Sequence, residues 1–119
     1  MMGRMKPKGE AAFNDLLYRL KRGAKKRGKK WDLPAEQVRA LTGMECSYCG
    51  CLPAQSVKHP HYNGDYPYNG LDRIDNDKGY VLGNVVPCCG TCNRMKGTMS
   101  IEDFMAHIRR FKIHLVTEQ

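Results

Sequence analysis

Asn84-Val-Val-Pro-Cys-Cys-Gly-Thr-Cys-Asn-Arg-Met-Lys96 is the stretch of sequence that decides the fold. It opens with a short β-branched run that predicts a strand. A Cys-x-x-Cys pair follows, and a helix is expected to begin near Gly90 and to end at Gly97, because glycine commonly stops a helix. Asn93 and Lys96 lie on this predicted helix. The stretch therefore combines a strand, two thiols and a helix that carries polar side chains.

The two thiols of this stretch have counterparts upstream. The 119-residue chain has six cysteines, and four of them form two Cys-x-x-Cys pairs with 39 residues between them. The two-residue spacing lets both thiolates of a pair reach one ion, and two pairs complete the tetrahedral site of a structural zinc ion. The sequence therefore predicts zinc bound by Cys46, Cys49, Cys89 and Cys92. Cys51 and Cys88 are left over, and we interpret them as small, buried or partly exposed side chains.

Disulfide bonds and a redox-active dithiol are the alternatives for these cysteines. The N-terminus has no apolar run typical of a secretory signal, which argues against disulfides. The duplication of the motif argues against a redox site. Zinc binding is worth on the order of 10–16 kcal/mol in small peptides, which is enough to order the loop-rich residues 44–70.

The segment between the two cysteine pairs predicts a β-hairpin. It contains Asn69-Gly-Leu-Asp-Arg-Ile-Asp-Asn-Asp-Lys-Gly-Tyr80. Alternating apolar residues predict a strand over residues 71–75, with Leu71 and Ile74 buried. Turn-forming residues follow, and residues 80–87 are expected to form the returning strand.

Helices are predicted on both sides of this hairpin, because apolar residues recur there at helical spacing. Residues 10–27 form an amphipathic pattern that ends at Gly28, and residues 35–41 form a shorter one. A last helix is expected after Ser100, which can cap it. Its expected core stripe consists of Phe104, Ile108, Phe111 and Leu115.

The positive charge of the chain is concentrated in its N-terminal part. The net charge is +8, and residues 1–30 hold 11 of the 20 Lys and Arg residues but only two acids. A basic helix of this kind suits contact with nucleic-acid phosphates. We expect Arg22, Lys25 and Lys26 to make such contacts, together with Lys96 from the later helix. A solvated helix face is the alternative interpretation.

These patterns divide the chain into three regions. Residues 1–9 are expected to form a disordered basic tail, residues 10–43 a basic helical region, and residues 44–119 a zinc-stabilised core with a C-terminal helix. No apolar run reaches the roughly 18 residues that a membrane span requires. We expect a protein of the reducing cytoplasm, or of the host cytoplasm if a phage encodes it.

The cysteine pairs and the segment between them resemble the HNH (ββα-metal) endonuclease family, in particular its small phage members. The resemblance also includes Ala24-Lys-Lys-Arg-Gly28, Trp31-x-Leu33 and Cys46-x-Tyr-Cys-Gly50, so it extends over roughly residues 13–112. It implies a small α+β fold with a zinc-bound ββα-metal core and flanking N- and C-terminal helices.

The resemblance also implies a catalytic metal site. In this family a hairpin and the following helix hold one divalent ion, and the motif positions fall on Asp72-Arg73, Asn84 and Asn93. Mg²⁺ or Mn²⁺ prefers oxygen ligands, so we expect Asp72 and Asn93 to bind it. Asn84 is expected to tie the hairpin loop through backbone hydrogen bonds, and Asp75 to orient Arg73 or to act as an outer partner.

One position departs from the family pattern. The family has a general-base histidine after the first aspartate, whereas this chain has Arg73. Arginine stays protonated and cannot accept a proton, although it can clamp a phosphate. His59, His61, Tyr68 or the bound metal alone are the alternatives for activating water. His107 and His114 receive no role.

The function that follows is a metal-dependent endonuclease that hydrolyses phosphodiester bonds in double-stranded DNA. A non-catalytic zinc module that binds DNA or phage packaging proteins is the main alternative, and a redox protein is a third. A homodimer is a further hypothesis, because cleavage of both strands favours two sites.

Overall fold

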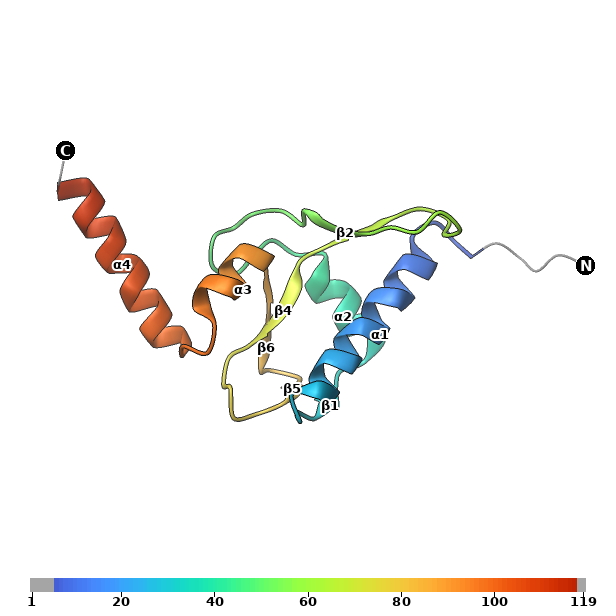
Figure 1. The fold of residues 1–119 in the computed structure, drawn as a ribbon, viewed down its shortest axis with the longest axis horizontal. Helices are drawn as coiled ribbons and strands as arrows, with labels where there is room; N and C mark the ends of the chain where they lie inside the picture. The colour runs from blue at the N-terminus through green and yellow to red at the C-terminus, as the bar shows by residue number, and fades with distance from the viewer. Residues whose placement is uncertain (1–5, 118–119) are drawn as a thin grey trace, which may run out of the picture.

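The computed structural model describes residues 6–117, and residues 1–5 and 118–119 lie outside the described part. Short strands and helices alternate along this part (Figure 1). The helices are α1 (Glu10–Lys26), α2 (Ala35–Thr42), α3 (Gly90–Lys96) and α4 (Ile101–Thr117). The strands are β1 (Trp31–Asp32), β2 (Gln55–Val57), β3 (Tyr66–Tyr68), β4 (Gly70–Arg73), β5 (Tyr80–Val81) and β6 (Val85–Cys88).

The antiparallel pair β4 and β6 forms the centre of the fold. Its register pairs Gly70 with Cys88 and Arg73 with Val85. The predicted hairpin is therefore present, but the prediction that Ile74 is buried is wrong, since 42% of this residue is exposed. β4 ends at Arg73, so Ile74 already belongs to the turn and no longer alternates with Leu71.

The predicted strand over residues 80–87 is in fact two strands. β5 pairs in parallel with β1, whereas β6 pairs with β4. Gly83 separates them with φ 83°, a left-handed conformation that glycine adopts without strain. The chain therefore changes partner within what looked like one apolar run.

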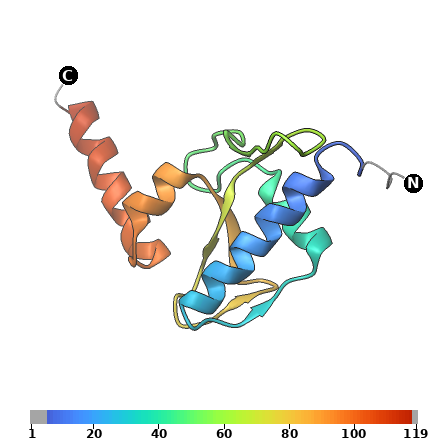
Figure 2. The same cartoon turned by 45° about the vertical axis from the view of Figure 1, so that its right-hand side comes forward.

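The helices α1 and α2 cover the hairpin and bury the main core, as the apolar spacing predicted (Figure 2). α1 begins at Glu10 and Arg27 caps its end, while α2 ends before Gly43. The core consists of Phe13, Ala24, Leu33, Val38, Leu71, Tyr80 and Val85, with Trp31 and Leu41 partly buried against it. Because α1 supplies residues at both of its ends, the N-terminal helix is integral to the fold.

The hairpin of β2 and β3 was not predicted. Gln55 pairs with Tyr68 and Val57 with Tyr66 in a region whose prolines and glycines indicated only loops. Val57 packs with Ala12 and Leu16, so this second hairpin rests on α1.

The structure describes only the inner part of the predicted N-terminal tail, which comprises residues 1–9. Residues 1–5 lie outside the described residues, whereas residues 6–9 lie against the loop that precedes β3. The Gly9 backbone N–H donates to the Asn63 carbonyl at 2.7 Å, and the Asn63 side chain donates to the Lys6 carbonyl at 2.9 Å. The inner end of this segment is therefore attached to the protein.

The predicted last helix forms, but it does not pack as expected. Ser100 caps it by accepting a hydrogen bond from the Asp103 N–H at 3.0 Å. Of its expected core stripe only Phe104 is buried, and Phe111 and Leu115 are 50% and 57% exposed. Figures 1 and 2 both show α4 leaving the body of the protein beside α3. Within the described residues, no helix is both long enough and apolar enough to span a membrane.

Candidate active site and metal centre

Four thiols converge where the loop after α2 meets the start of α3. The Sγ atoms of Cys46, Cys49, Cys89 and Cys92 all lie within 4.8 Å of one another. The Sγ atoms of Cys49 and Cys89 are 3.8 Å apart, close to the edge of about 3.8 Å that follows from tetrahedral geometry at a Zn–S distance of about 2.3 Å. The Cys92 N–H also donates to the Cys89 sulfur at 3.3 Å, which suits a thiolate acceptor. The four cysteines form a cluster that fits a zinc ion.

The pKa shifts of the clustered thiols run in both directions, because the pKa values of Cys46 and Cys89 are lowered by hydrogen bonds whereas burial and the neighbouring thiols raise that of Cys92. Burial acts to raise the pKa of Cys46, but backbone N–H donors outweigh it and lower this pKa to about 6. In contrast, burial together with the nearby Asp72 charge raises the pKa of Cys88 to about 12. The Cys88 thiol also donates to the Cys89 carbonyl at 3.4 Å. Cys88 therefore remains a protonated, buried thiol, in agreement with its interpretation as a packing residue.

A cleft of about 680 Å³ lies between α1 and the β4–β6 hairpin. Asp72 and Arg73 line it from the end of β4, and Asn93 lines it from α3. The structure thus brings these three predicted site residues to one cavity. Asn93 follows Cys92 directly, so the thiol cluster fixes the start of the helix that carries it.

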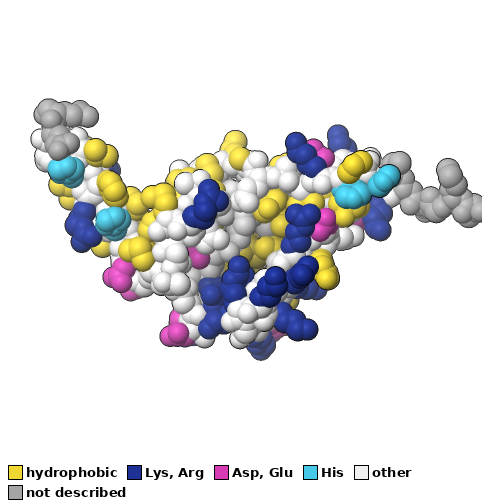
Figure 3. Space-filling view, viewed as in Figure 1, with side chains coloured by type: hydrophobic (Ala, Val, Ile, Leu, Met, Phe, Trp, Pro, Cys, Tyr) yellow, Lys and Arg dark blue, Asp and Glu magenta, His cyan; other side chains and the backbone are white. Residues whose placement is uncertain are grey.

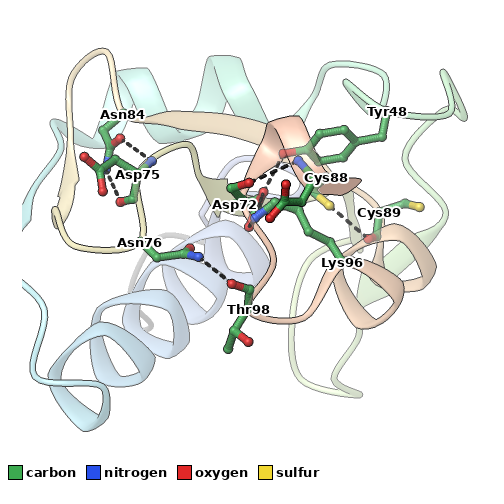
Figure 4. Close-up of polar contacts among 11 residues, drawn as sticks. Tyr48, Asp72, Asp75, Asn76, Asn84, Cys88, Cys89, Lys96 and Thr98 are labelled. Atoms are coloured by element: carbon green, nitrogen blue, oxygen red, sulfur yellow. Dashed lines mark hydrogen bonds and ion pairs between the residues drawn. The ribbon is translucent and has the colours of Figure 1, made fainter. Parts of the chain in front are cut away.

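Asp72 is held by two residues from separate parts of the chain (Figure 4). The Lys96 ammonium lies 3.1 Å from Asp72 Oδ2 and 3.3 Å from Oδ1, and the Tyr48 hydroxyl donates to Oδ2 at 2.5 Å. The Lys96 side chain is 0% exposed and that of Asp72 8%. Lys96 therefore lies in the interior, paired with Asp72, and not on the surface where contact with a neighbouring phosphate was expected.

Tyr48 is a site residue that the sequence interpretation missed. It stands between Cys46 and Cys49, and its ring packs edge-on against Phe104 at 5.3 Å between centroids. Burial and the hydrogen bond to Asp72 both raise the pKa of Tyr48, so its hydroxyl stays protonated and acts as a donor. An aromatic hydroxyl inside a predicted zinc knuckle was the signal that could have identified it.

The loop between β4 and β5 is organised by Arg73 and Asn84. Arg73 Nη1 donates to the carbonyls of Asn76 and Lys78 at 2.8 and 3.2 Å. The Asn84 side chain accepts from the Asp75 N–H at 2.9 Å and donates to the Gly79 carbonyl at 2.8 Å. These are the backbone hydrogen bonds that were predicted for Asn84.

The side chain of Asp75 has a local partner. Its Oδ1 atom accepts from the Asp77 N–H at 2.9 Å, which closes a turn within the loop. Beside it, the Asn76 amide donates to the Thr98 carbonyl at 3.0 Å and connects the loop to the end of α3 (Figure 4). Asp75 therefore supports the loop backbone.

The basic residues of α1 divide into two groups. Arg19 and Arg27, together with Lys29 beyond the helix, line the cleft that contains Asp72. In contrast, Arg22, Lys25 and Lys26, the residues expected to bind nucleic acid, line a separate shallow hollow on α1 with Tyr18 and Lys21. Figure 3 shows Lys and Arg side chains gathered near the C-terminal end of α1. Asp72 is the only acid among the described residues that line the cleft.

The three side chains considered for activating water, His59, His61 and Tyr68, differ in whether they line the cleft. The His59 ring packs against those of His61 and Tyr62 in the loop before β3, and neither histidine lines the cleft. Tyr68 does line it, from β3. Among the described residues that form this cleft there is no histidine.

The fold has a counterpart among solved structures. The chain is similar to the rare-cutting HNH restriction endonuclease PacI, with a TM-score of 0.59 and 23% identity, over 77% of this chain and 70% of that one. The protein is therefore a small α+β chain with an HNH-endonuclease-like fold and a thiol cluster suited to a metal, as the sequence predicted.

A sequence relative is also known. The chain is 33% identical over 92 residues to an uncharacterized protein of Acanthamoeba polyphaga mimivirus. The match covers 77% of this chain but spans only 15% of the viral protein. No family model matches the chain.

Proposed function

We propose that this protein is a metal-dependent DNA endonuclease of the HNH family, with its active site in the cleft between α1 and the β4–β6 hairpin. The observation that carries the proposal is the meeting of Asp72, Arg73 and Asn93 in one basic cleft. The likeness to PacI supports a nuclease fold. A basic cleft attracts a polyanion, and its Arg and Lys side chains can neutralise phosphates.

The side chains available to a catalytic metal fit a hard divalent cation. A carboxylate has about four acceptor sites, and the three contacts from Lys96 and Tyr48 leave one of them on Asp72 Oδ1. The exposed Asn93 side chain offers an amide oxygen in the same cleft. A bound Mg²⁺ or Mn²⁺ would stabilise charge on the scissile phosphate and the leaving oxygen.

The residues of the chain itself have separate tasks in this proposal. Tyr48 and Lys96 fix the direction of the Asp72 carboxylate, and zinc on the thiol cluster fixes Tyr48 and Asn93. Arg73 uses Nη1 to hold the loop, which leaves the rest of its guanidinium for a phosphate oxygen. Arg27 and Lys29 guide the DNA backbone into the cleft.

Nicking of plasmid DNA under titration of Mg²⁺ or Mn²⁺ tests the proposal. Asn93→Ala is the cleanest variant, because Asn93 is exposed and its substitution creates no buried defect. We expect it to reduce cleavage at least tenfold while zinc content and melting temperature stay unchanged. Asn14→Ala on the exposed side of α1 is the matched control and should cleave normally. Equal activity of both variants would remove Asn93 from the site.

A non-catalytic DNA-binding module is the second candidate, and one observation favours it. The negative charge of Asp72 is already balanced by Lys96, as in a purely structural ion pair. This candidate predicts DNA binding without nicking under any metal. Arg73→His adds a further test, because a gain in cleavage rate would show an active site that lacks only its base.

A further inference from the structure

Among the described residues that line the cleft, Asp72 carries the only negative charge. Four positively charged side chains line the same cleft, namely Arg19, Arg27, Lys29 and Arg73. Arg19 pairs with Asp15 at 2.9 Å, which still leaves three cations against one carboxylate. A cleft of this charge attracts a polyanion such as DNA and repels a small cation.

Lys96 neutralises the Asp72 carboxylate from the interior of the protein (Figure 4). Its ammonium lies 3.1 Å from Oδ2 and 3.3 Å from Oδ1, so it contacts both carboxylate oxygens. The Lys96 side chain is 0% exposed, and it belongs to the last residue of α3. The ammonium therefore cannot reach solvent without displacing its neighbours, and it stays beside the carboxylate.

A divalent cation bound to Asp72 shares its ligand with this ammonium. Asp72 contributes a charge of −1, Lys96 a charge of +1 and the amide of Asn93 none, so the protein offers the cation oxygen ligands without net negative charge. Two cations on one carboxylate repel each other, and this repulsion is stronger inside a protein than in water. The DNA-free protein is therefore expected to hold the cation weakly.

A DNA phosphate supplies what the cleft lacks. It brings a negative charge together with oxygen atoms, the ligands that Mg²⁺ and Mn²⁺ prefer. The basic side chains of the cleft can hold this phosphate beside Asp72 and Asn93, which line the same cavity. The bound phosphate then offsets the positive charge that opposes the cation.

We propose that Lys96 makes the binding of a divalent cation at Asp72 depend on bound DNA. The inference rests on the proposed nuclease function and adds to it an order of assembly. Lys96 acts here as a positioning residue that lowers the affinity of the free protein for the cation. Coupling between two binding sites is reciprocal, so the cation raises the affinity for DNA by the same factor.

Binding of Mn²⁺ to the full zinc-loaded chain tests this dependence, with electron paramagnetic resonance reporting the free ion. The titration is done without DNA and with a short duplex that has phosphorothioate linkages, which are hydrolysed slowly. A titration of the duplex alone gives the Mn²⁺ that DNA binds by itself. We expect the duplex to raise the Mn²⁺ affinity of the wild-type protein at least about tenfold. Equal affinity with and without the duplex overturns the inference.

A matched pair of variants tests the role of Lys96. Lys96→Gln and Tyr48→Phe each remove a native contact with the Asp72 carboxylate, but only the first removes a positive charge. The glutamine amide can still donate to Asp72, which makes this variant milder than Lys96→Met. We expect Lys96→Gln to bind Mn²⁺ without DNA at least about tenfold more tightly than wild type, and Tyr48→Phe to stay close to wild type. Wild-type affinity in a folded, zinc-loaded Lys96→Gln protein overturns the role of Lys96.

The same measurements separate this inference from the proposed function. A chain that nicks plasmid DNA but binds Mn²⁺ equally well with and without the duplex remains a nuclease and refutes only the inference. A chain that neither nicks plasmid DNA nor binds Mn²⁺ in the presence of the duplex refutes both. The wild-type titration decides the dependence on DNA even where a Lys96 variant fails to fold.

Discussion

The ion pair between Lys96 and Asp72 places two charges where water barely reaches them. Removing one partner of such a pair leaves the other buried and uncompensated, which typically costs about 3–5 kcal/mol. We expect Lys96→Met to lower the free energy of unfolding by about this amount, since the Lys96 side chain is 0% exposed. Urea denaturation of the zinc-loaded protein measures it.

The exposed Lys78 provides the control for this substitution. Lys78→Met removes the same charge from the hairpin loop and should leave the unfolding midpoint within error. The double variant Asp72→Asn, Lys96→Met should recover part of the stability, because neither charge then remains unpaired. A Lys96→Met protein as stable as the Lys78→Met protein contradicts the buried pair.

Tyr48 makes a pH-dependent contribution to stability. Its pKa is raised in the folded state, chiefly by burial and by the hydrogen bond to Asp72, whereas the unfolded chain ionises Tyr near pH 10. A group whose pKa is higher in the folded state stabilises the protein at pH values below its unfolded pKa. This contribution to stability falls as the pH rises above the unfolded pKa. Wild type should therefore exceed Tyr48→Phe in stability by about 1.5–3 kcal/mol at neutral pH.

The comparison of these two proteins against pH gives the test. The stability advantage of wild type should stay constant up to about pH 9 and shrink above about pH 10. Other groups titrate in both proteins, so the difference between them isolates Tyr48. An advantage that grows at high pH would contradict the assigned hydrogen bond.

At the scale of elements, the two Cys-x-x-Cys pairs determine where α3 begins and where Tyr48 lies. The sequence shows which cysteines have ligand spacing, but Cys51 and Cys88 could still have competed for the ion. Among the described residues, the four thiols of the two Cys-x-x-Cys pairs form the group that lies mutually within 4.8 Å, although the Cys51 thiol also lies near Cys49 and Cys89 and the Cys88 thiol near Cys46. Cys51 lies only two residues beyond Cys49, so spacing in the sequence alone could not exclude it as a ligand.

Single cysteine substitutions test this division. We expect Cys49→Ser to release zinc and to unfold at a much lower temperature, because structural zinc is worth on the order of 10–16 kcal/mol in small peptides. Cys51→Ser should keep one zinc ion per chain by elemental analysis, although Cys51 is an exposed thiol close in sequence. Release of zinc from Cys51→Ser would show that the assignment of the fourth ligand is wrong.

The sequence-based predictions were accurate where the structure depends only on neighbouring residues, and less accurate where it depends on residues far away in the sequence. The helix end at Gly97 and the Ser100 cap follow from neighbouring residues, and both were predicted. The division of residues 80–87 into β5 and β6 depends on β1, which lies far away in sequence. An apolar run does not show which strand its residues will pair with.

At the scale of the whole molecule, the packing of α1 decides which of its basic residues line the cleft. On an isolated helix, every exposed Lys and Arg carries the same positive charge. The sequence therefore favoured Arg22, Lys25 and Lys26, which lie close together near the end of the helix. In the folded protein the cleft is lined by Arg19 and Arg27, which lie on another side of α1. This choice depends on the packing of α1 on the hairpin and could not be predicted locally.

Two triple variants separate these groups at equal charge. Changing Arg19, Arg27 and Lys29 to Gln removes three charges from the cleft, whereas changing Arg22, Lys25 and Lys26 to Gln removes three from the outer hollow. For duplex DNA, the slope of log affinity against log salt falls by about 0.9 for each phosphate that the protein no longer neutralises. We expect the cleft variant to show the larger decrease in slope and to cleave far more slowly than wild type. If the outer variant shows the larger decrease in both measurements, DNA lies along the outer side of α1 and the proposed cleft is not its binding site.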